Sequence, residues 1–435
     1  MEVIGLNQEK IKSISKVKNE DSWVLDYRLK SYDLFNKIEL PSFGPKYEID
    51  FDNIIYYKDN SNGIKANWNE INGDVKNELD NLGVLESERH LDGIGVQYES
   101  EVIYHNMIKE LEEKNVIFTS IEVAMKNYPD LVQKYFGTIV SNDENKFTAL
   151  NSTVFSGGSF IYIPPHTKLE RPLQSYFRIN SKGMGQFERT LIIVDDDSEL
   201  HYIEGCTAPT YTDSSLHAAV VEIYVGKNSK CRYTTIQNWA TNVLNLVTKR
   251  ALVEENGTME WIDGNIGSKV TMKYPCCILK GNYSNGTCIT ISVASNHQQQ
   301  DTGAKMIHLG KHTSSKIVSK SIARDGGNAT YRGKADIKEN ADHSEAMIKC
   351  DTLILDEKSK SDTFQTNICS NQTSNIEHEA TVAKINEEKL FYLMSRGLSK
   401  EKAMELIVLG FIEEFKEELP MEYAVELNRL LKENL

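Results

Sequence analysis

The feature that most constrains the fold is a long central segment in which short apolar runs recur at a loose spacing. Between about residues 151 and 380, β-branched and aromatic runs alternate with clusters of Gly, Asn, Asp and Ser, as is typical of strands joined by turns. Runs centred near Leu191, Val221, Leu252, Ile278 and Ile307 lie roughly 25–30 residues apart, in the range of stacked repeats. A sandwich or a large barrel could also supply many short strands. The irregular turns favour a β-helix, in which each coil buries its apolar face against its neighbours.

Helical patterns precede this segment. Segment 21–37 offers Asp21 or Ser22 as an N-cap ahead of a broad apolar stripe, and segment 98–114 places apolar residues at helical spacing. Both segments are therefore predicted to be helices. The sequence divides into a mainly helical N-terminal domain, residues 1–145, and a β core domain, residues 146–383.

The C-terminal segment is helical again. Gly397 is suited to end one helix, and Ser399 to cap a second with apolar residues at positions 403, 406, 407, 410 and 411. Pro420 stands where the first turn of a last helix would begin. This predicted domain, residues 384–435, is too short for a large core of its own. We therefore expect it to dock on the β segment or on a partner.

The charge balance narrows the classes of partner. A net charge of -14 over 435 residues argues against non-specific nucleic-acid binding, which needs a basic surface. No run approaches the ~18–20 apolar residues of a membrane span. The N-terminus also lacks the pattern of a secretory signal. The chain is expected to be soluble and intracellular, with neither nucleic acid nor membrane as a partner.

The motifs of common enzyme classes are missing. The sequence contains no phosphate-cradling G-x-x-x-x-G-K-[ST] loop, no dinucleotide fingerprint of strand, GxGxxG and helix, and no G-x-S-x-G nucleophile elbow. "HEATVAK" begins like a zinc-protease motif, but Val382 occupies the place of the second histidine. A self-contained hydrolase, kinase or dehydrogenase is therefore poorly supported, and the chain is expected not to be an enzyme.

The stretch "SNIEHEATV" near the C-terminus holds two carboxylates around one imidazole. On a strand, Glu377 and Glu379 face one side, while His378 faces the other with Ile376 and Ala380. All three polar groups cannot bind one ion unless a bulge re-aims a side chain. From these residues alone, a metal site, an acid–base group and an ordinary strand surface all remain open.

Cysteines and scattered polar residues give weaker signals. The seven cysteines are odd in number and form no C-x-x-C pair, so neither a disulfide framework nor a zinc ribbon is indicated. On strands, Arg178 and Asn180 would share one face, and so would Gln237 and Trp239. Taken singly, each of these residues is more often structural than functional.

Several long segments together resemble one known family. They read "MGQFERTLIIVDDDSELHYIEGCTAP", "TTIQNW", "NLVTKRA", "MEWIDGNIGSKVTMKYP", "DTGAKMIHLG", "KCDTLI" and "IEHEA", and they stand in the family's order. The sequence is similar to the SufB/SufD family of the SUF iron–sulfur cluster assembly system from about Trp23 to the C-terminus. The "EGCTAP" and "QNW" segments look like the B type of this family.

The resemblance implies a fold and a set of partners. The fold would be a right-handed parallel β-helix between N-terminal and C-terminal helical domains. The partners would be a SufC-type ABC ATPase docked on the C-terminal helices, and a SufD-type paralogue or a second copy of the chain across the edge of the β-helix. A cysteine desulfurase system (SufS with SufE or SufU) would supply sulfur, and apo-proteins or carriers would accept the finished cluster.

The resemblance also assigns residues. The family's sulfur-accepting cysteine falls on Cys206, and its interfacial cluster-binding cysteine falls on Cys350, with Glu377, His378 and Glu379 beside it. The internal sulfur path corresponds to Arg178, Asn180, Gln237, Trp239 and Lys249. Cys276, Cys277, Cys288 and Cys369 receive no role and are expected to pack.

These assignments agree with the chemistry of the residue types. A thiolate accepts sulfane sulfur by attacking a sulfur–sulfur bond, and nearby positive charge, from Arg178 or Lys249 if the fold brings them close, would favour the thiolate. Thiolate and imidazole hold iron in clusters, whereas a carboxylate is a harder ligand. Such a mixed set would bind a transient iron–sulfur cluster weakly enough for it to leave.

Two alternatives differ in kind. An enzyme on a β-solenoid could use Glu377 and Glu379 as paired carboxylates for sugar hydrolysis, although residues i and i+2 of a strand point the same way instead of flanking a bond. A purely structural SufD-like partner is the other alternative. The resemblance leaves open the cluster type, the sulfur donor and a reduced flavin in the complex. The expected location is the bacterial cytoplasm, with a plastid-type organelle as the alternative.

Overall fold

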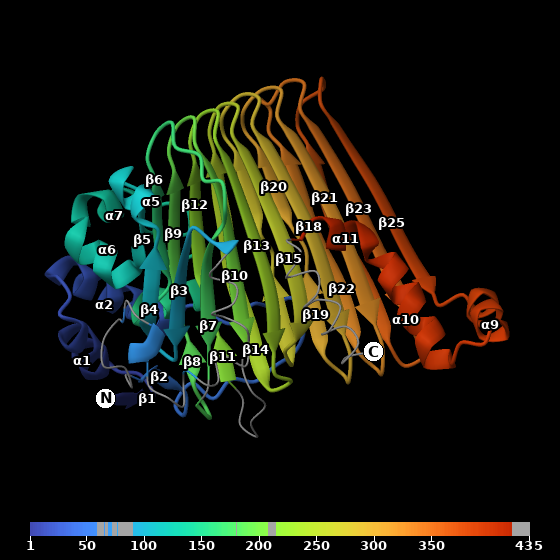
Figure 1. Ribbon diagram of the computed structural model, residues 1–435, viewed down its shortest axis with the longest axis horizontal. Helices are drawn as coiled ribbons and strands as arrows, with labels where there is room; N and C mark the ends of the chain where they lie inside the picture. The colour runs from blue at the N-terminus through green and yellow to red at the C-terminus, as the bar shows by residue number, and fades with distance from the viewer. Residues whose placement is uncertain are drawn as a thin grey trace.

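The computed structural model describes residues 1–58, 65, 68–71, 76, 90–179, 181–207 and 215–419. Within these ranges the chain forms a parallel β-helix whose coils stack side by side, with helices at the N-terminal and C-terminal ends (Figure 1). The predicted mainly β fold with helical flanks is confirmed. Among the described helices, none is long and apolar enough to cross a membrane.

Two large sheets form the walls of the coils. The chain alternates between them, so consecutive strands within each wall are mostly parallel. The first sheet contains, in spatial order, β25 (Asn375–Lys384), β23 (Glu345–Ile354), β21 (Ser314–Ala323), β18 (Asn285–Ala294), β15 (Thr258–Gly267), β13 (Lys230–Trp239), β10 (Glu199–Thr207), β7 (Leu173–Arg178), β3 (Gly93–Tyr98) and β4 (Glu101–Met107). The second sheet contains β16 (Val270–Lys273), β19 (Gln299–Thr302), β22 (Asn328–Ile337), β20 (Lys305–His308), β17 (Cys276–Leu279), β14 (Val243–Val253), β12 (Val220–Val225), β9 (Arg189–Val194), β6 (Ser159–Ile163) and β5 (Ile117–Ser120), with β8 (Gly185–Gln186), β11 (Ser215–His217) and β24 (Lys360–Cys369) beside this path.

The register between coils explains the spacing seen in the sequence. Met259 pairs with Gly286 on the next coil, and Ser315 pairs with Ala346. Each coil thus adds about thirty residues, which confirms the repeat inferred from the apolar runs. Because the pairing is in register, side chains at equivalent positions form straight files along the β-helix.

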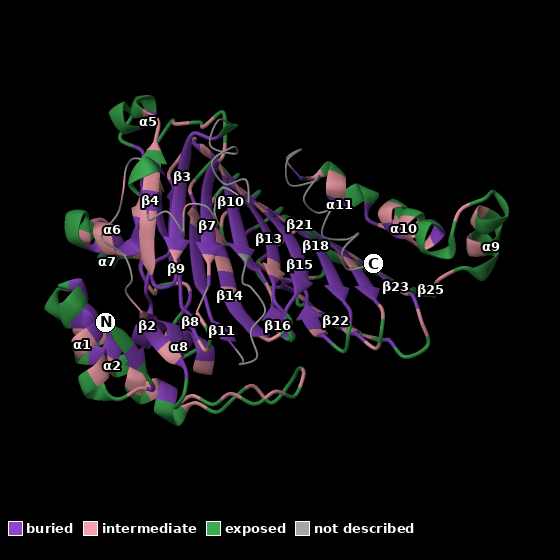
Figure 2. Ribbon diagram, turned by 60° about the horizontal axis from the view of Figure 1, so that its bottom comes forward, coloured by how far each residue is buried: buried purple, intermediate pink, exposed green. Residues whose placement is uncertain are grey.

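Side chains that point into the coils make the main core. Tyr202, Tyr233, Trp261 and Cys288 occupy equivalent inward positions on successive strands and are all buried. Figure 2 shows this buried interior running through the stacked strands. Cys276, Cys277 and Cys288 pack as expected, but the prediction is wrong for Cys369, which is exposed near the end of β24. It lies on the last coils, which no further described coil covers.

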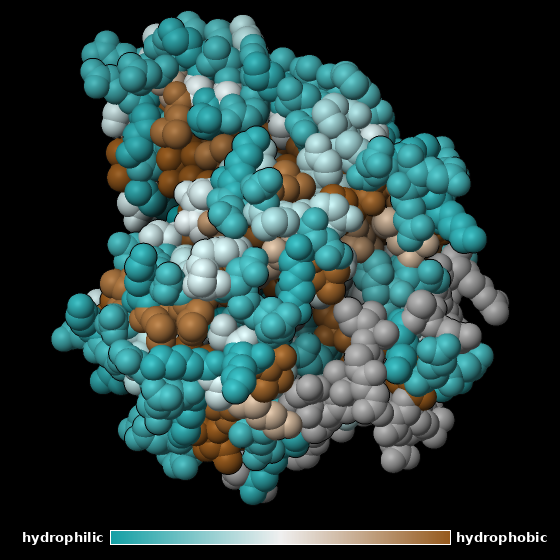
Figure 3. Space-filling view, turned by 90° about the vertical axis from the view of Figure 1, so that its left-hand side faces the viewer, coloured by the Kyte–Doolittle hydropathy of each residue, from teal (hydrophilic) through white to brown (hydrophobic). Residues whose placement is uncertain are grey.

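The N-terminal helices cover the outer face of the second sheet at the start of the β-helix. They are α1 (Gln8–Lys18), α2 (Ser22–Lys37), α6 (Ile121–Asn127), α7 (Pro129–Tyr135) and α8 (Lys146–Val154), with the paired strands β1 (Glu2–Ile4) and β2 (Ile55–Lys58). The first two helices and α8 pack with Leu216 and Leu244 of the sheet, and α6 and α7 pack with Leu191. The short α5 (Lys109–Glu113) packs into the inner core instead, and η1 (Trp68–Glu70) packs on the first sheet. Figure 3 views this end and shows a mainly hydrophilic surface with separate hydrophobic patches.

One N-terminal helix was predicted correctly and one was not. Segment 21–37 forms α2, with Asp21 at the N-cap position. Segment 98–114 is not one helix: it forms β4 and then the short α5. The β-branched and aromatic run of Val102, Ile103 and Tyr104 pairs antiparallel with β3, and this pairing overrides the helical spacing of the apolar residues.

The C-terminal helices are α9 (Glu387–Ser395), α10 (Lys400–Phe411) and α11 (Glu413–Glu417). The predicted caps are confirmed: Gly397 follows α9 with φ +93°, and Ser399 accepts a hydrogen bond from the Lys402 backbone N–H. Val408 and Phe415 pack on the outer face of the first sheet. The segment therefore docks on the β-helix, whereas Pro420 and the last predicted helix lie outside the described residues.

The last coil, formed by β24 and β25, differs from all the others. Its side chains are mostly exposed, including those of Phe364, Ile368 and Val382. β25 pairs with β23 on one side, and no described strand pairs with its other side. The β-helix therefore ends, within the described residues, in an open coil with an unpaired strand edge, which is the kind of surface that another chain can cover.

Candidate functional site

Two groups of polar residues lie inside the β-helix at different depths. The first group surrounds Cys206 in the middle coils, and we call Glu204, Lys249, Asp263 and Lys273 the inner cluster. The second group, Cys350 with His378 and Glu379, lies on the last two coils of the first sheet, and we call it the open-end site. Both use inward positions of the strands, although Glu379 takes part only through its backbone.

Cys206 is held in the middle of the first sheet. On β10 it pairs with Phe177 of β7 on one side and with Gln237 of β13 on the other. Its thiol is buried and lies 3.7 Å from Oε1 of Glu204, two residues earlier on the same strand face. The Tyr233 hydroxyl donates a hydrogen bond to the other oxygen of this carboxylate.

The inner cluster brings buried side chains of opposite charge together. Lys249 Nζ lies 3.9 Å from Glu204 Oε1 and 3.5 Å from Asp263 Oδ1, and Lys273 Nζ lies 3.3 Å from Asp263 Oδ2. All four side chains are buried. Charges this deep persist only when they are paired, because desolvation costs several kcal/mol per ion.

The cluster sets the protonation of its members. Burial, reinforced by the negative charges of Glu204 and Glu188, raises the pKa of the Cys206 thiol well above its usual range, and the positive charges of Lys249 and Lys273 offset only part of this effect. Lys249 thus lies near the thiol as expected, but the net effect on the thiol pKa is opposite to the one anticipated. Burial also lowers the pKa of Lys273 to about 8.

A buried histidine is connected to the cluster by hydrogen bonds. His217 lies 2.9 Å from Glu188 Oε2 through Nε2 and 2.7 Å from Asn245 Oδ1 through Nδ1. Asn245 donates to Gln237 Oε1, which also accepts from Lys273 at 3.2 Å. Burial acts to lower the pKa of His217, but the negative charge of Glu188 and the hydrogen bonds to Glu188 and Asn245 together raise it.

Several polar atoms of this region have no hydrogen-bond partner within the described structure. They include Lys249 Nζ, both carboxylate oxygens of Asp263, Gln237 Nε2 and Trp239 Nε1. Buried polar groups are normally satisfied by protein or by ordered water. This concentration of unsatisfied groups therefore marks a place suited to hold water or a small polar species inside the β-helix.

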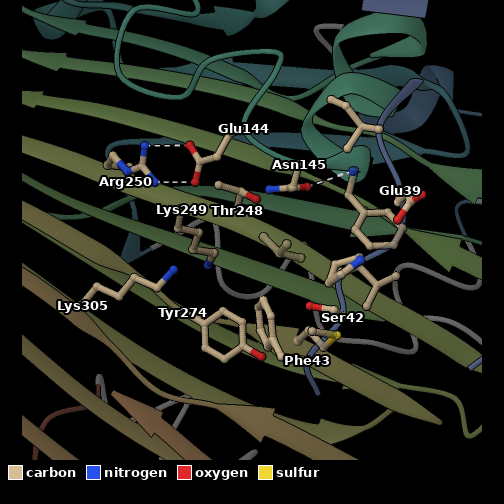
Figure 4. Close-up of a pocket in the computed structure, with 16 residues that line it drawn as sticks. Glu39, Ser42, Phe43, Glu144, Asn145, Thr248, Lys249, Arg250, Tyr274 and Lys305 are labelled. Carbon is tan, nitrogen blue, oxygen red and sulfur yellow. Dashed lines mark hydrogen bonds and ion pairs between the residues drawn. The ribbon is translucent and has the colours of Figure 1, made fainter. Parts of the chain in front are cut away.

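A pocket of about 360 Å³ lies on the outer side of the second sheet, over β14 (Figure 4). It is bounded by the segment around Phe43 and by β14, with the Glu144–Arg250 ion pair, 2.6 Å, on its rim. Lys249 belongs to the pocket lining, while its ammonium group reaches Asp263. Lys249 thus stands in the wall between the outer pocket and the inner cluster.

The other path residues of the sequence prediction are distributed differently. Trp239 is buried in one apolar group with Cys206 and contacts the His217 ring, with centroids 4.6 Å apart. Arg178 follows Phe177 on β7 and pairs with Thr207, so strand alternation directs it to the face opposite Cys206. Asn180 lies outside the described residues.

The open-end site pairs a thiol with an imidazole. Cys350 Sγ on β23 lies 3.4 Å from His378 Nε2 on β25, and 3.6 Å from the backbone oxygen of Glu379. Burial, with the Asp351 charge, raises the pKa of the Cys350 thiol to about 11. The histidine is exposed on the last coil, so the two groups face the open end together.

The two glutamates of this strand point elsewhere. Glu379 pairs with Lys349, and Glu377 pairs with Met347, at positions that alternate with Cys350 and face outward. Glu377 accepts a hydrogen bond from Asn375. The alternation inferred from "SNIEHEATV" is therefore confirmed. In the described part of the chain no group of three His, Cys, Asp or Glu residues is arranged to hold a metal ion.

Two straight files of polar side chains join the sites. Each occupies one inward position on the successive strands β10, β13, β15, β18, β21 and β23 of the first sheet, and the hydroxyls of Thr290 and Ser319 are 3.0 Å apart within one of them. One file consists of Glu204, Thr235, Asp263, Thr290, Ser319 and Cys350, and the other of Cys206, Gln237, Asn265, Ser292, Ser321 and Thr352. Apolar side chains would be expected at such inward positions, so the files are a departure that requires a reason.

Comparison with known proteins adds an independent line of evidence. A family model described as SUF system FeS cluster assembly, SufBD core domain, matches residues 177–411, and one described as SufBD protein N-terminal region matches residues 97–175. An iron-sulfur cluster assembly SufBD family protein of Staphylococcus aureus (strain MRSA252) is 56% identical over 430 residues, covering 98% of this chain and 92% of that protein. The iron-sulfur cluster assembly protein SufB of Bacillus subtilis (strain 168) is 54% identical with the same coverage.

Proposed function

Because the chain belongs to the SufBD family of iron–sulfur cluster assembly proteins, we propose that it is a scaffold that accepts persulfide sulfur at Cys206 and builds a nascent cluster at Cys350. In this role the cluster is cargo, and the chain itself hydrolyses nothing. The observation that carries the proposal is the pair of adjacent polar files inside the β-helix, one of which begins at Cys206 and the other of which ends at Cys350.

Sulfur acceptance at Cys206 requires a thiolate and a polar surrounding for the transferred sulfur. Cys206 is an inward cysteine whose thiol contacts Glu204 of the inner cluster, and Gln237 is its neighbour on the next coil. Lys249, in the wall between the outer pocket and the cluster, supplies a cation that can stabilise an anionic sulfur species. Trp239 closes the apolar side of the site.

Passage toward Cys350 would follow the polar files. Neighbouring strands are about 4.8 Å apart, so a sulfur species moving along a file meets a hydroxyl, amide or carboxylate at every coil. Thr290 and Ser319 provide hydroxyls in hydrogen-bond contact on adjacent coils. An apolar interior would instead oppose the movement of a charged species.

Cluster assembly would occur at the open-end site. Cys350 and His378 provide one thiolate and one imidazole, both established ligands of iron in clusters. Two protein ligands leave the rest of the iron coordination to other donors. Because the last coil is open, a SufD-type partner or a second copy could supply these donors. Glu379, and after it Glu377, are further candidate ligands at the outer edge of the coil.

The C-terminal helices suit a separate partner. Phe391 and Tyr392 on α9 are 73% and 56% exposed, which is unusual for large apolar side chains. A SufC-type ATPase is the partner we propose for this segment, residues 384–435, and a desulfurase system would deliver sulfur to the core segment, residues 146–383. The N-terminal segment, residues 1–145, would have a structural role.

Anaerobic reconstitution tests the proposal. The chain, co-expressed with its candidate ATPase and paralogous partner, is incubated with ferrous iron and sulfide and followed by visible absorption. We expect charge-transfer bands that are lost in Cys350→Ala and retained in Cys369→Ala, the matched variant at an exposed thiol on the last coils. Retention of the bands in Cys350→Ala would contradict the assembly site.

A second measurement tests sulfur acceptance separately. A desulfurase charged with radioactive sulfur should label the wild-type chain and leave Cys206→Ser unlabelled. Gel analysis without reductant detects the label, and Cys231→Ser, a buried thiol on the neighbouring strand, serves as the control. Labelling of Cys206→Ser at the wild-type level would contradict the role of Cys206.

A further inference from the structure

The carboxylate of Glu204 is the group best placed to act on the Cys206 thiol. Resting on the proposed role of Cys206 as sulfur acceptor, we propose that Glu204 is the general base that removes the thiol proton when the donor persulfide arrives. Glu204 precedes Cys206 by two residues on β10, and its Oε1 is 3.7 Å from the sulfur. The assignment makes Glu204 a catalytic residue.

A base is needed because the thiol is kept neutral. The thiolate is the nucleophile in sulfur transfer, yet burial and neighbouring negative charge raise the pKa of Cys206 well above its usual range. The titratable and charged groups that act on it from its own and neighbouring elements are Glu204, Glu188, Lys249, Lys273, Tyr202 and Tyr233. A free thiolate would therefore be rare, and the proton must leave as the new bond forms.

Among the described residues, no other candidate for this task is recorded in contact with the sulfur. Both ring nitrogens of His217 already have partners, Glu188 and Asn245. The ammonium of Lys273 donates to Gln237 and lies beside Asp263. Glu204 alone has a carboxylate oxygen directed at the sulfur among the described contacts of Cys206.

The inner cluster keeps Glu204 ready to accept a proton. The Tyr233 hydroxyl donates to its second oxygen, and Lys249 stands 3.9 Å from the oxygen that faces the thiol. Both contacts hold the carboxylate in place beside the thiol. Asp263 in turn holds Lys249 in place at 3.5 Å, so Asp263 is a positioning residue for the reaction.

The transfer step balances without an external oxidant or reductant. Glu204 takes the Cys206 proton, and the Cys206 sulfur bonds to the outer sulfur of the donor persulfide. The bond between the two donor sulfurs breaks, and its electron pair leaves on the donor thiolate, which recovers the proton from Glu204. The products are a Cys206 persulfide and a donor thiol.

The test uses methyl methanethiosulfonate, a small reagent that transfers a methylthio group to a thiolate with loss of methanesulfinate. Modification of the Cys206 peptide is followed by mass spectrometry between pH 6 and 9. For Glu204→Gln we expect a rate at pH 7 that is ~100-fold lower, the size of effect typical of a lost general base. The residual rate should rise tenfold per pH unit, while the wild-type rate changes little.

A purely electrostatic role of Glu204 predicts the opposite change in rate. If Glu204 only repels the thiolate, removing its charge lowers the thiol pKa, so Glu204→Gln would react faster than wild type. A faster or unchanged rate therefore overturns the proposal. Glu199→Gln, an exposed carboxylate on the same strand, should react like wild type.

A second variant guards against misfolding. Glu204→Asp retains the negative charge but moves the carboxylate away from the sulfur. If Glu204 is a base, this variant should react more slowly than wild type. If its role is purely electrostatic, the rate should not fall. The experiment is also separable from the proposed function. If wild type takes no sulfur from a persulfide donor while the Glu204 variants still slow methylthiolation, sulfur acceptance fails and the base assignment stands.

Discussion

The inner cluster and the open-end site use the same structural element in opposite surroundings. Both place polar groups at inward positions of consecutive strands. Around Cys206 there are coils on both sides, so every charge is buried and paired. On the outer side of Cys350 there is only the last coil: β25 pairs with β23, no described strand pairs with the other side of β25, and His378 on β25 is exposed.

This difference shows how position along a solenoid controls chemistry. In the middle, neighbouring coils can fix a carboxylate against a thiol, and Glu204 lies within contact of Cys206. At the end, the donor set stays incomplete, and the carboxylate of Glu379 points away. The middle therefore suits a reaction step, and the end suits the binding of something that must later leave.

The largest expected contrast is in stability. Asp263→Ala leaves two buried ammonium groups without their shared carboxylate, so it should lower the free energy of unfolding by about 3–5 kcal/mol. Glu379→Ala at the exposed edge should change it by less than about 0.5 kcal/mol. Urea denaturation measures both. Asp263→Asn, which keeps the volume, should lose most of the same amount, and a loss below about 1 kcal/mol would show that the charges are not paired.

The second largest effect is expected in the reactivity of the thiols, where Cys350 of the open-end site should differ from an exposed cysteine. With a pKa of about 11, Cys350 is almost entirely protonated at pH 8. Its alkylation by iodoacetamide should be ~100-fold slower than that of the exposed Cys369, and should rise tenfold per pH unit toward pH 10. Peptide mass spectrometry gives both rates. A pH-independent rate at Cys350 would mean that this thiol also has a local base, and the contrast with Cys206 would be lost.

A smaller effect is expected in the pH dependence of stability. Burial lowers the pKa of Lys273 to about 8 from an unfolded value of 10.5, so above pH 8 the unfolded chain holds a proton that the native chain lacks. The penalty for burying this lysine is fully present below pH 8 and is relieved as the pH rises. From pH 8 to 9, wild type should gain about 1 kcal/mol relative to Lys273→Met. Lys311→Met, on the surface, should show the wild-type pH dependence.

A contrast of about the same size concerns the hydroxyls of the polar files. Thr290→Val removes a donor to Ser319 without changing the side-chain volume much, and should cost about 0.5–1.5 kcal/mol. Thr381→Val on the exposed last strand should stay within about 0.5 kcal/mol. Thermal unfolding of both variants makes the comparison. Equal effects would indicate that the files are hydrated enough to replace the lost contact.

The coil repeat of the β-helix could be predicted from the sequence, but the pairing register between neighbouring strands could not. The spacing of apolar runs and the caps at Gly397 and Ser399 predicted the β-helix and its C-terminal helices. Turn lengths vary between coils, so the pairing of Asp263 with Thr290, or of Cys206 with Gln237, could not be calculated. Helical spacing also misled at segment 98–114, where pairing with β3 decided the structure.

The candidate site was predicted in the same partial way. The resemblance supplied Cys206, Lys249 and Cys350, but Glu204, Asp263, Lys273 and His217 were missed. A usable signal was present for Asp263, which shares a strand face with Met259 and Trp261, so a charge stood where only apolar residues were expected. Its partners come from the other sheet, and only the fold reveals them.

The coil repeat has a consequence for how the distance between the two cysteines can change. Four strands of the first sheet, β13, β15, β18 and β21, separate β10 from β23, which fixes the span at about 24 Å. Substitutions and loop insertions leave that span untouched, because the strands remain one spacing apart. A descendant of this chain can therefore lengthen or shorten the distance between the two cysteines only by a whole coil at a time.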